Sequence, residues 1–261
     1  MRHLFSRSVD APVVEDGMLP VCSTDDCAKH YEQLLDLQAF WIARHPRLPF
    51  YTLGATNYYD LVGSVSGPYL QLARQYNALL RECFAKLYEQ LREALETHLR
   101  QPVGWLADVR PSALPGFHLF LGHQRFTAGE KMDVTHAHWF ARRDGEDFPG
   151  NPVHADTAHM ALGLDGLTLS FTLPIALPRL GSGMRIWRMC RAEAQGLADA
   201  EFLAKLAERA CADVSYTPGH LWLHDGNAYH KALGLPRHEK EVRFTLQGHG
   251  VWDGDHWQLF W

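Results

Sequence analysis

The sequence has few cysteines, no long apolar run and no excess of basic side chains. Its five cysteines are odd in number and irregularly spaced, and no second cysteine pair stands at the spacing of a zinc site. We therefore expect a reduced, cytoplasmic protein. No apolar run approaches the roughly 18 residues that cross a bilayer, and the first residues lack the apolar core of a signal peptide. The net charge of −5 gives no basic surface for nucleic acid or an anionic membrane.

The chain is long and apolar enough for one large domain, or for a domain with a helical extension. It has 261 residues, of which 46% are hydrophobic. Apolar residues recur at helical spacing over about 25–44 and 69–99, which predicts two amphipathic helices. From residue 114 onward, short β-branched or aromatic runs are divided by Gly, Pro and Asp, which predicts many short antiparallel strands. We expect an α+β protein, with a helical region over 1–113 packed on a β-rich barrel or sandwich over 114–261 in one compact domain.

A His-x-Asp motif at His154 and Asp156 is the first candidate for a metal site. With 16 His and 30 acidic residues in the chain, about two such motifs are expected by chance, and two occur. The other, His30-x-Glu32, lies in a predicted helix, where residues two apart point to different sides. His154 follows a Gly-Asn-Pro turn, and residues i and i+2 of an extended strand share a face. His154 and Asp156 are therefore suited to supply two neighbouring ligands.

His230 and Arg243 complete the candidate site. Two histidines and one carboxylate form the facial triad that holds non-haem Fe(II) with open coordination positions. His230 lies 76 residues after His154, and Arg243 follows 13 residues later. Arg243 is a fixed cation suited to the far carboxylate of a chelating acid. His224 is a rival to His230, but it stands at a strand end before the turn signal Asp-Gly, and we favour His230.

The second half of the sequence resembles the Fe(II)/2-oxoglutarate-dependent oxygenases, in a bacterial branch that acts on small molecules. The resemblance rests on the order His-x-Asp, distal His and then Arg about a dozen residues later. It also rests on the phrases LPGFHLF, SFTLPIALP, YTPGHLWLHDGNAYH and RFTLQGHG. It covers about 114–261 and implies a double-stranded β-helix (a jelly-roll, cupin-like core) with the N-terminal helices packed on it.

The resemblance also implies cofactors and residue roles. His154, Asp156 and His230 would bind Fe(II), 2-oxoglutarate would fill two further positions on the metal, and O₂ would take the last. Arg243 would pair with the C5 carboxylate of 2-oxoglutarate, and Thr245, two residues along the same strand, would add a hydroxyl donor. Halogenating members of the superfamily have a small residue in place of the carboxylate ligand. Because Asp156 is present, hydroxylation or a related oxidation is favoured.

The expected substrate is a small molecule, such as an amino acid or a biosynthetic intermediate, and the expected assembly is a monomer or a homodimer. Arg185 and Trp187 alternate in GMRIWRM and are candidates for substrate contact from the barrel interior. A core Trp beside a surface Arg is the simpler interpretation of the same pattern. His136 is a third candidate, in a Gly- and charge-rich stretch that we expect to be a loop.

Two alternatives stay open at the level of sequence. One is a cupin-like metalloenzyme without redox chemistry, such as an isomerase or hydrolase using Zn²⁺ or Mn²⁺, with His136 and His138 as ligands. The other is a metal-free small-molecule binding module in which the histidines are structural. Arg243 favours the oxygenase, because a cupin does not require a fixed arginine 13 residues after its last ligand.

Overall fold

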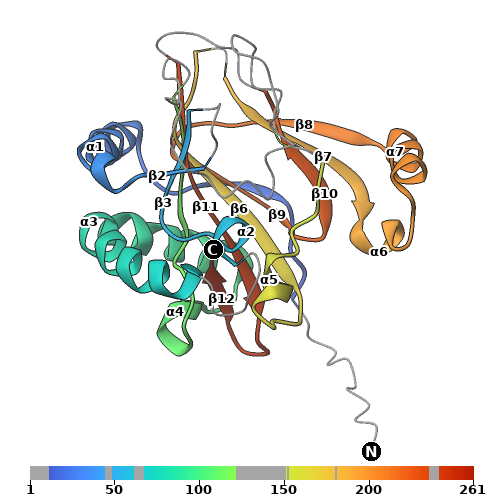
Figure 1. The fold of residues 1–261 in the computed structure, drawn as a ribbon, viewed down its shortest axis with the longest axis horizontal. Helices are drawn as coiled ribbons and strands as arrows, with labels where there is room; N and C mark the ends of the chain where they lie inside the picture. Colours follow the sequence, from blue (N-terminus) through green and yellow to red (C-terminus); the bar gives the residue numbers. More distant parts are fainter. Residues whose placement is uncertain are drawn as a thin grey trace, which may run out of the picture.

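The computed structural model describes residues 12–44, 49–61, 68–121, 151, 153–179, 181–234 and 241–261. Within these ranges the chain combines helices with two largely antiparallel sheets (Figure 1). The predicted α+β class is therefore confirmed. His136 and His138 lie outside the described residues, so their predicted roles stay predictions.

The main sheet has nine strands in the described part of the chain. Seven follow the order β1-β9-β6-β11-β5-β3-β2, while β12 pairs with β11 and β4 pairs with β12. All pairs are antiparallel except β12 with β4, which is parallel. The strands are β1 (Gly17–Pro20), β2 (Ile42–Ala43), β3 (Phe50–Leu53), β4 (Val103–Trp105), β5 (Gly116–Leu121), β6 (Thr168–Ala176), β9 (His220–Asp225), β11 (Val242–Trp252) and β12 (Trp257–Phe260).

A second, smaller sheet stands apart from the main one. Its three described strands are β7 (Gly183–Cys190), β8 (Cys211–Ser215) and β10 (Ala228–Ala232), in the order β10-β7-β8. Figure 1 places α1 and α3 to one side of the main sheet, and α6 and α7 at the far end of the smaller sheet. The helices are α1 (Thr24–Asp36), η1 (Gln38–Phe40), α2 (Asn57–Asp60), α3 (Pro68–Leu99), α4 (Leu106–Val109), α5 (Ala158–Ala161), α6 (Arg191–Ala194) and α7 (Asp199–Ala207).

The two long N-terminal helices cover the main sheet with their apolar faces. The buried residues of α3 recur every three or four positions, as the sequence predicts, and join one core with Leu34 of α1 and Phe244 of β11. The Ser23 hydroxyl accepts a hydrogen bond from the Asp26 N–H at 3.1 Å and caps α1. The predicted extension of α1 to residue 44 is wrong, because the helix ends at Asp36 and the chain continues into η1 and β2.

Alternation along the two central strands divides the core from a cavity. On β6, Leu169, Phe171 and Leu173 pack in the helix-covered core, while Ser170 and Thr172 line the cavity. On β11, Phe244 and Leu246 are in the core, while Arg243, Gln247 and His249 line the cavity. Successive side chains of a strand point to opposite faces, so one strand supplies both the apolar core and the polar site.

Strands from the first half of the chain extend the main sheet at both edges. β1 pairs with β9, and β3 pairs with β5. The ranges 1–113 and 114–261 therefore share one sheet as well as one hydrophobic core. The sequence pattern predicted only helices before residue 114, because these strands are four residues or fewer and too short to show an alternation.

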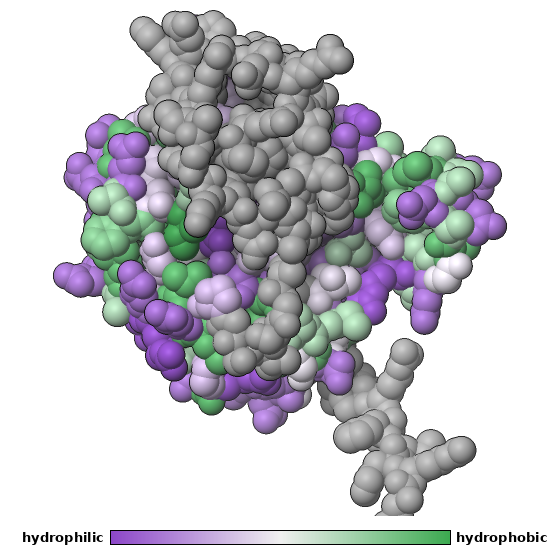
Figure 2. Space-filling view, viewed as in Figure 1, coloured by the Kyte–Doolittle hydropathy of each residue, from purple (hydrophilic) through white to green (hydrophobic). Residues whose placement is uncertain are grey.

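The exterior of the helical side is polar. Figure 2 shows hydrophilic side chains along the rim of the face in view, and the exposed positions of α3 include Arg74, Arg81, Lys86 and Glu89. No helix among the described residues combines the length and the apolar character that a membrane span requires.

A buried ion pair fixes the short helix α2. Two Arg44 nitrogens contact the Asp60 carboxylate at 2.7 and 2.9 Å, and the Thr56 N–H donates to the same carboxylate at 2.7 Å. Both charged side chains are buried. Removing one partner of such a pair leaves the other charge desolvated and unpaired. This pair therefore ties the chain between β2 and α2 to the fold.

We expect Arg44→Met to lower the free energy of unfolding by about 3–5 kcal/mol, because the Asp60 carboxylate stays buried without its partner. Urea denaturation measures the change. Arg81→Met is the matched control, since Arg81 pairs with Asp108 and both side chains are about half exposed. That exposed pair should contribute less than about 1 kcal/mol. Equal losses in the two variants would contradict the assignment of Arg44 as a buried anchor.

Candidate metal centre

Two histidines far apart in the sequence face each other across an isolated β-bridge. The His154 N–H donates to the His230 carbonyl at 3.0 Å, and the His230 N–H donates to the His154 carbonyl at 2.8 Å. Their imidazole rings lie 4.5 Å apart between centroids. His230 is held in β10, so the bridge fixes the otherwise irregular segment around His154 against the smaller sheet.

Asp156 brings a carboxylate to the two imidazoles. Its own N–H donates to the Gly226 carbonyl at 3.0 Å, just before β10. Oδ1 of Asp156 lies 3.8 Å from Nε2 of His154, and Oδ2 lies 3.6 Å from Nε2 of His230. One ligand atom from each of the three residues lies within 4.8 Å of the other two. The structure thus places the three predicted residues together, in the part of the chain that it describes.

The donor set and its spacing fit a divalent transition metal. Ligand atoms that bind one ion at about 2.1 Å are about 3 Å apart at a right angle and at most about 4.2 Å apart. The two nitrogen–oxygen separations lie inside this range. Nδ1 of His230 lies 2.9 Å from the Ala228 carbonyl oxygen, and because a carbonyl only accepts, Nδ1 carries the proton. In the neutral imidazole Nε2 is therefore unprotonated, and it faces Asp156. Two imidazoles and one carboxylate with cavity on the open side are the ligands of a non-haem Fe(II) site.

The protonation states also suit a metal. Burial lowers the pKa of His230 to about 4, so its imidazole is neutral near pH 7, which is the form that binds metals. Burial alone would raise the pKa of Asp156, but His230, His249 and His154 outweigh it and hold that pKa well below its usual range. The site therefore presents the negative Asp156 carboxylate beside the neutral imidazole of His230.

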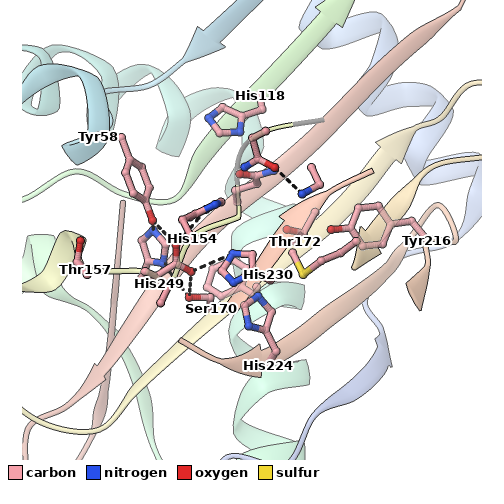
Figure 3. A pocket seen from close by; sticks show the side chains of 18 of the residues that line it. Tyr58, His118, His154, Thr157, Ser170, Thr172, Tyr216, His224, His230 and His249 are labelled. Atoms are coloured by element: carbon pink, nitrogen blue, oxygen red, sulfur yellow. Dashed lines mark hydrogen bonds and ion pairs between the residues drawn. The ribbon is translucent and has the colours of Figure 1, made fainter. Parts of the chain in front are cut away.

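The three residues open into a cavity of about 240 Å³ (Figure 3). Its walls come from both sheets, with Met184 and Ala232 of the smaller sheet opposite Ser170 and Thr172 of the main sheet. Tyr58 of α2 reaches it from the N-terminal region. In Figure 3, His154, His230 and His249 cluster on one side, while Thr172 and Tyr216 lie on the other.

Arg243 lies in the same cavity as a buried cation without an anion. Among the described residues no carboxylate lies within ion-pair distance of it. Its Nη1 donates to the Leu233 carbonyl at 3.4 Å, and the Tyr216 hydroxyl lies nearby. Its guanidinium carbon is 5.7 Å from the centre of the Tyr216 ring. Burial lowers the pKa of Arg243, but a guanidinium stays charged in proteins. The buried Tyr216 hydroxyl makes no hydrogen bond of normal geometry. Both groups are therefore available to an anion.

Thr245 does not line this cavity. Its hydroxyl accepts a hydrogen bond from Nε2 of Gln247 at 3.1 Å, and Gln247 lines the cavity in its place. The predicted contact between Thr245 and 2-oxoglutarate stays a prediction. Tyr216 and Thr172 are the hydroxyl groups that the structure places in the cavity with Arg243.

The other described candidates are not part of the group of three ligands. Nε and Nη2 of Arg185 each donate to the Asp213 carboxylate at 2.6 Å, and both side chains are about half exposed. Trp187 lines a different cavity, of about 610 Å³, together with Trp222. Neither residue lines the metal cavity, and their predicted substrate contacts stay predictions. The ring centroid of His224 lies 4.6 Å from that of His230, and Nδ1 of His224 donates to the Asp225 carbonyl at 3.0 Å, but His224 is not one of the three grouped residues.

Several residues of the site were not anticipated. His249 shares the strand face of Arg243, so an alternation carried further along 243–251 would have placed it in the cavity. Ser170 and Thr172 are polar residues two apart in an otherwise apolar strand, and this alternation also predicts that they share one face. Tyr58 carries no such signal, because its place depends on how α2 packs.

No protein-family model matches the chain, and no curated protein sequence matches it. Solved structures do. An N-substituted L-amino acid dioxygenase from Burkholderia ambifaria AMMD, in complex with α-ketoglutarate, has a TM-score of 0.53 and 15% identity, covering 93% of this chain and 84% of that one. The non-haem α-ketoglutarate-dependent epimerase SnoN from nogalamycin biosynthesis has a TM-score of 0.50 and 10% identity, covering 91% and 80%.

The chain therefore shares its fold with these two proteins. Of the predicted fold, the combination of helices with largely antiparallel sheets is confirmed. At these identities the likeness concerns the fold, and the chemistry has to be argued from the site.

Proposed function

We propose that this protein is a non-haem Fe(II)- and 2-oxoglutarate-dependent oxygenase that oxidises a small molecule, such as an amino acid or a biosynthetic intermediate. The observation that carries the proposal is one cavity that holds both a His-Asp-His group and a buried arginine for which the described residues supply no anion. The first feature fits the metal, and the second fits the far carboxylate of a chelating keto acid. The fold is the same as that of the amino acid dioxygenase and the epimerase described above.

His154, Asp156 and His230 would hold the iron. Arg243 would receive the C5 carboxylate of 2-oxoglutarate through two parallel N–H donors, with the Tyr216 hydroxyl as a further donor. Iron with bound 2-oxoglutarate supplies the activation of O₂ and the oxidation of an unactivated C–H bond. The protein supplies the geometry, a dry cavity and the charges.

The charges balance when the cavity is loaded. The two positive charges of Fe(II) and the one of Arg243 match the carboxylate of Asp156 and the two carboxylates of 2-oxoglutarate. The side chains alone place a buried cation, Arg243, and a buried anion, Asp156, that are not paired with each other, which is unfavourable in a low-dielectric interior. The arrangement is therefore built for a dianionic ligand and a dication together.

We also propose the finer features that the sequence suggested. The two sheets would face each other as a double-stranded β-helix, since the cavity is lined from both. The range 114–261 would be its catalytic core, and 1–113 would buttress it within one domain. Asp156 in the ligand position favours hydroxylation over halogenation. A cytoplasmic monomer or homodimer remains our expectation.

Succinate formation tests the proposal directly. The iron-loaded protein is incubated with 2-oxoglutarate and a panel of amino acids in air, and succinate is quantified. We expect succinate only when Fe(II), 2-oxoglutarate and O₂ are all present, and a higher yield with one group of substrates. Protein loaded with Zn(II) is the control, because Zn(II) has no redox chemistry. Equal product from zinc-loaded protein or without O₂ would instead favour the non-redox, cupin-like alternative.

A further inference from the structure

The Asp156 carboxylate is enclosed by polar side chains to which the proposed function assigns no role. The Tyr58 hydroxyl donates to Oδ1 of Asp156, and the Ser170 hydroxyl donates to Oδ2 at 2.5 Å. Each carboxylate oxygen therefore has one protein donor, and each keeps a second lone pair free. The two donors approach from different elements, α2 and β6.

His249 of β11 lies between these two donors. Its Nδ1 lies 3.0 Å from the Ser170 hydroxyl oxygen, and its Nε2 lies 3.2 Å from the Tyr58 hydroxyl oxygen. Figure 3 shows Tyr58, Ser170 and His249 close together, and all three contact one another or Asp156. Asp156, Ser170 and His249 are all buried, so water does not compete for these contacts.

Asp156 accepts from both hydroxyls. Burial, together with the charge of Asp156, raises the pKa of Tyr58 well above its usual value, so the phenol keeps its proton and donates it. A neutral imidazole has one N–H, so His249 donates to only one of the two hydroxyl oxygens while both hydroxyls donate to Asp156. The carboxylate is therefore held by two donors from two elements, α2 and β6.

We propose that Tyr58, Ser170 and His249 are positioning residues that hold the Asp156 carboxylate in the orientation required for metal binding. Partners of a metal ligand fix its orientation and donor strength, and their loss costs about 10–100-fold in metal affinity or activity. The inference rests on the metal site of the proposed function, but not on its redox chemistry. It also gives the N-terminal region a part in the metal centre, through Tyr58.

The test measures Co(II) binding, because Co(II) occupies such sites and reports its ligand geometry in the visible spectrum. Tyr58→Phe removes one hydroxyl and keeps the ring, and Ser170→Ala removes the other. We expect each variant to raise the Co(II) dissociation constant about tenfold or more and to change the visible spectrum. The double variant should approach about 100-fold. His249→Phe, which reaches Asp156 mainly through the two hydroxyls, should have a smaller effect.

Tyr76→Phe is the matched control. Its hydroxyl is also buried and donates one hydrogen bond, to the Phe40 carbonyl at 2.7 Å, but it does not line the cavity. It should leave the Co(II) dissociation constant and spectrum unchanged. Circular dichroism and thermal denaturation of each metal-free variant verify that it is folded.

The outcomes separate this inference from the proposed function. If the unaltered protein binds Co(II) and folded Tyr58→Phe and Ser170→Ala bind it equally tightly, the positioning role is wrong and the metal site stands. If the variants lose affinity but the iron-loaded protein forms no succinate, the positioning role stands and the oxygenase proposal fails. If the unaltered protein binds no Co(II), both are overturned.

Discussion

Asp156→Ala is expected to abolish succinate formation and to weaken Fe(II) binding by more than about 100-fold. Loss of a hydrogen-bond partner of a ligand costs up to about 100-fold, and loss of the ligand itself should cost more. The variant removes one of three ligand atoms and the only negative charge that the described residues place beside the ion. Equilibrium dialysis of Fe(II) under anaerobic conditions and a succinate assay measure the two effects.

The same substitution should affect the metal-free protein much less. It leaves the Tyr58 and Ser170 hydroxyls without their acceptor, which costs about 1–3 kcal/mol in the free energy of unfolding. Asp255→Ala, at an exposed acidic residue, is the control and should change neither iron binding nor activity. Asp156→Ala with full activity would show that the ligand assignment is wrong.

Arg243→Met is the second substitution with a large expected effect. It should raise the KM for 2-oxoglutarate by at least about 30-fold, since losing one partner of a buried charge pair costs about 2 kcal/mol or more. Fe(II) affinity should not change, because Arg243 does not belong to the ligand group. The measurement is succinate formation against 2-oxoglutarate concentration, with Arg92→Met, on the surface of α3, as the control.

The metal-free stability of Arg243→Met provides a second readout. Among the described residues Arg243 has no carboxylate partner, so replacing it with an apolar side chain of similar length should leave the melting temperature unchanged or raise it. A large loss of stability would indicate that Arg243 is a structural residue. An unchanged KM would contradict its role in binding the keto acid.

The sequence was sufficient for the parts of the site that depend on local geometry. A two-residue spacing in an extended segment brings His154 and Asp156 to the same side, and this needs no knowledge of the rest of the fold. The distal His230 and the buried Arg243 were identified by their order and spacing, and the structure places both in the cavity with His154. The long helix α3 was predicted from its apolar repeat for the same reason.

The remainder depends on contacts between distant segments. Tyr58 reaches Asp156 from α2, which the Arg44–Asp60 pair anchors, and no local pattern encodes either contact. Thr245 shares a strand face with Arg243, as expected, but a side-chain hydrogen bond from Gln247 occupies its hydroxyl. Strand alternation predicts the direction of a side chain, whereas its partners depend on packing.

The most direct test of the central claim is anaerobic. Fe(II) and then 2-oxoglutarate are added to the metal-free protein, and the visible metal-to-ligand charge-transfer band of the chelated keto acid is recorded. We predict that the band appears in the unaltered protein and is absent in His230→Ala. No band from folded protein that has bound its iron would contradict the oxygenase assignment and would favour a non-redox metal site.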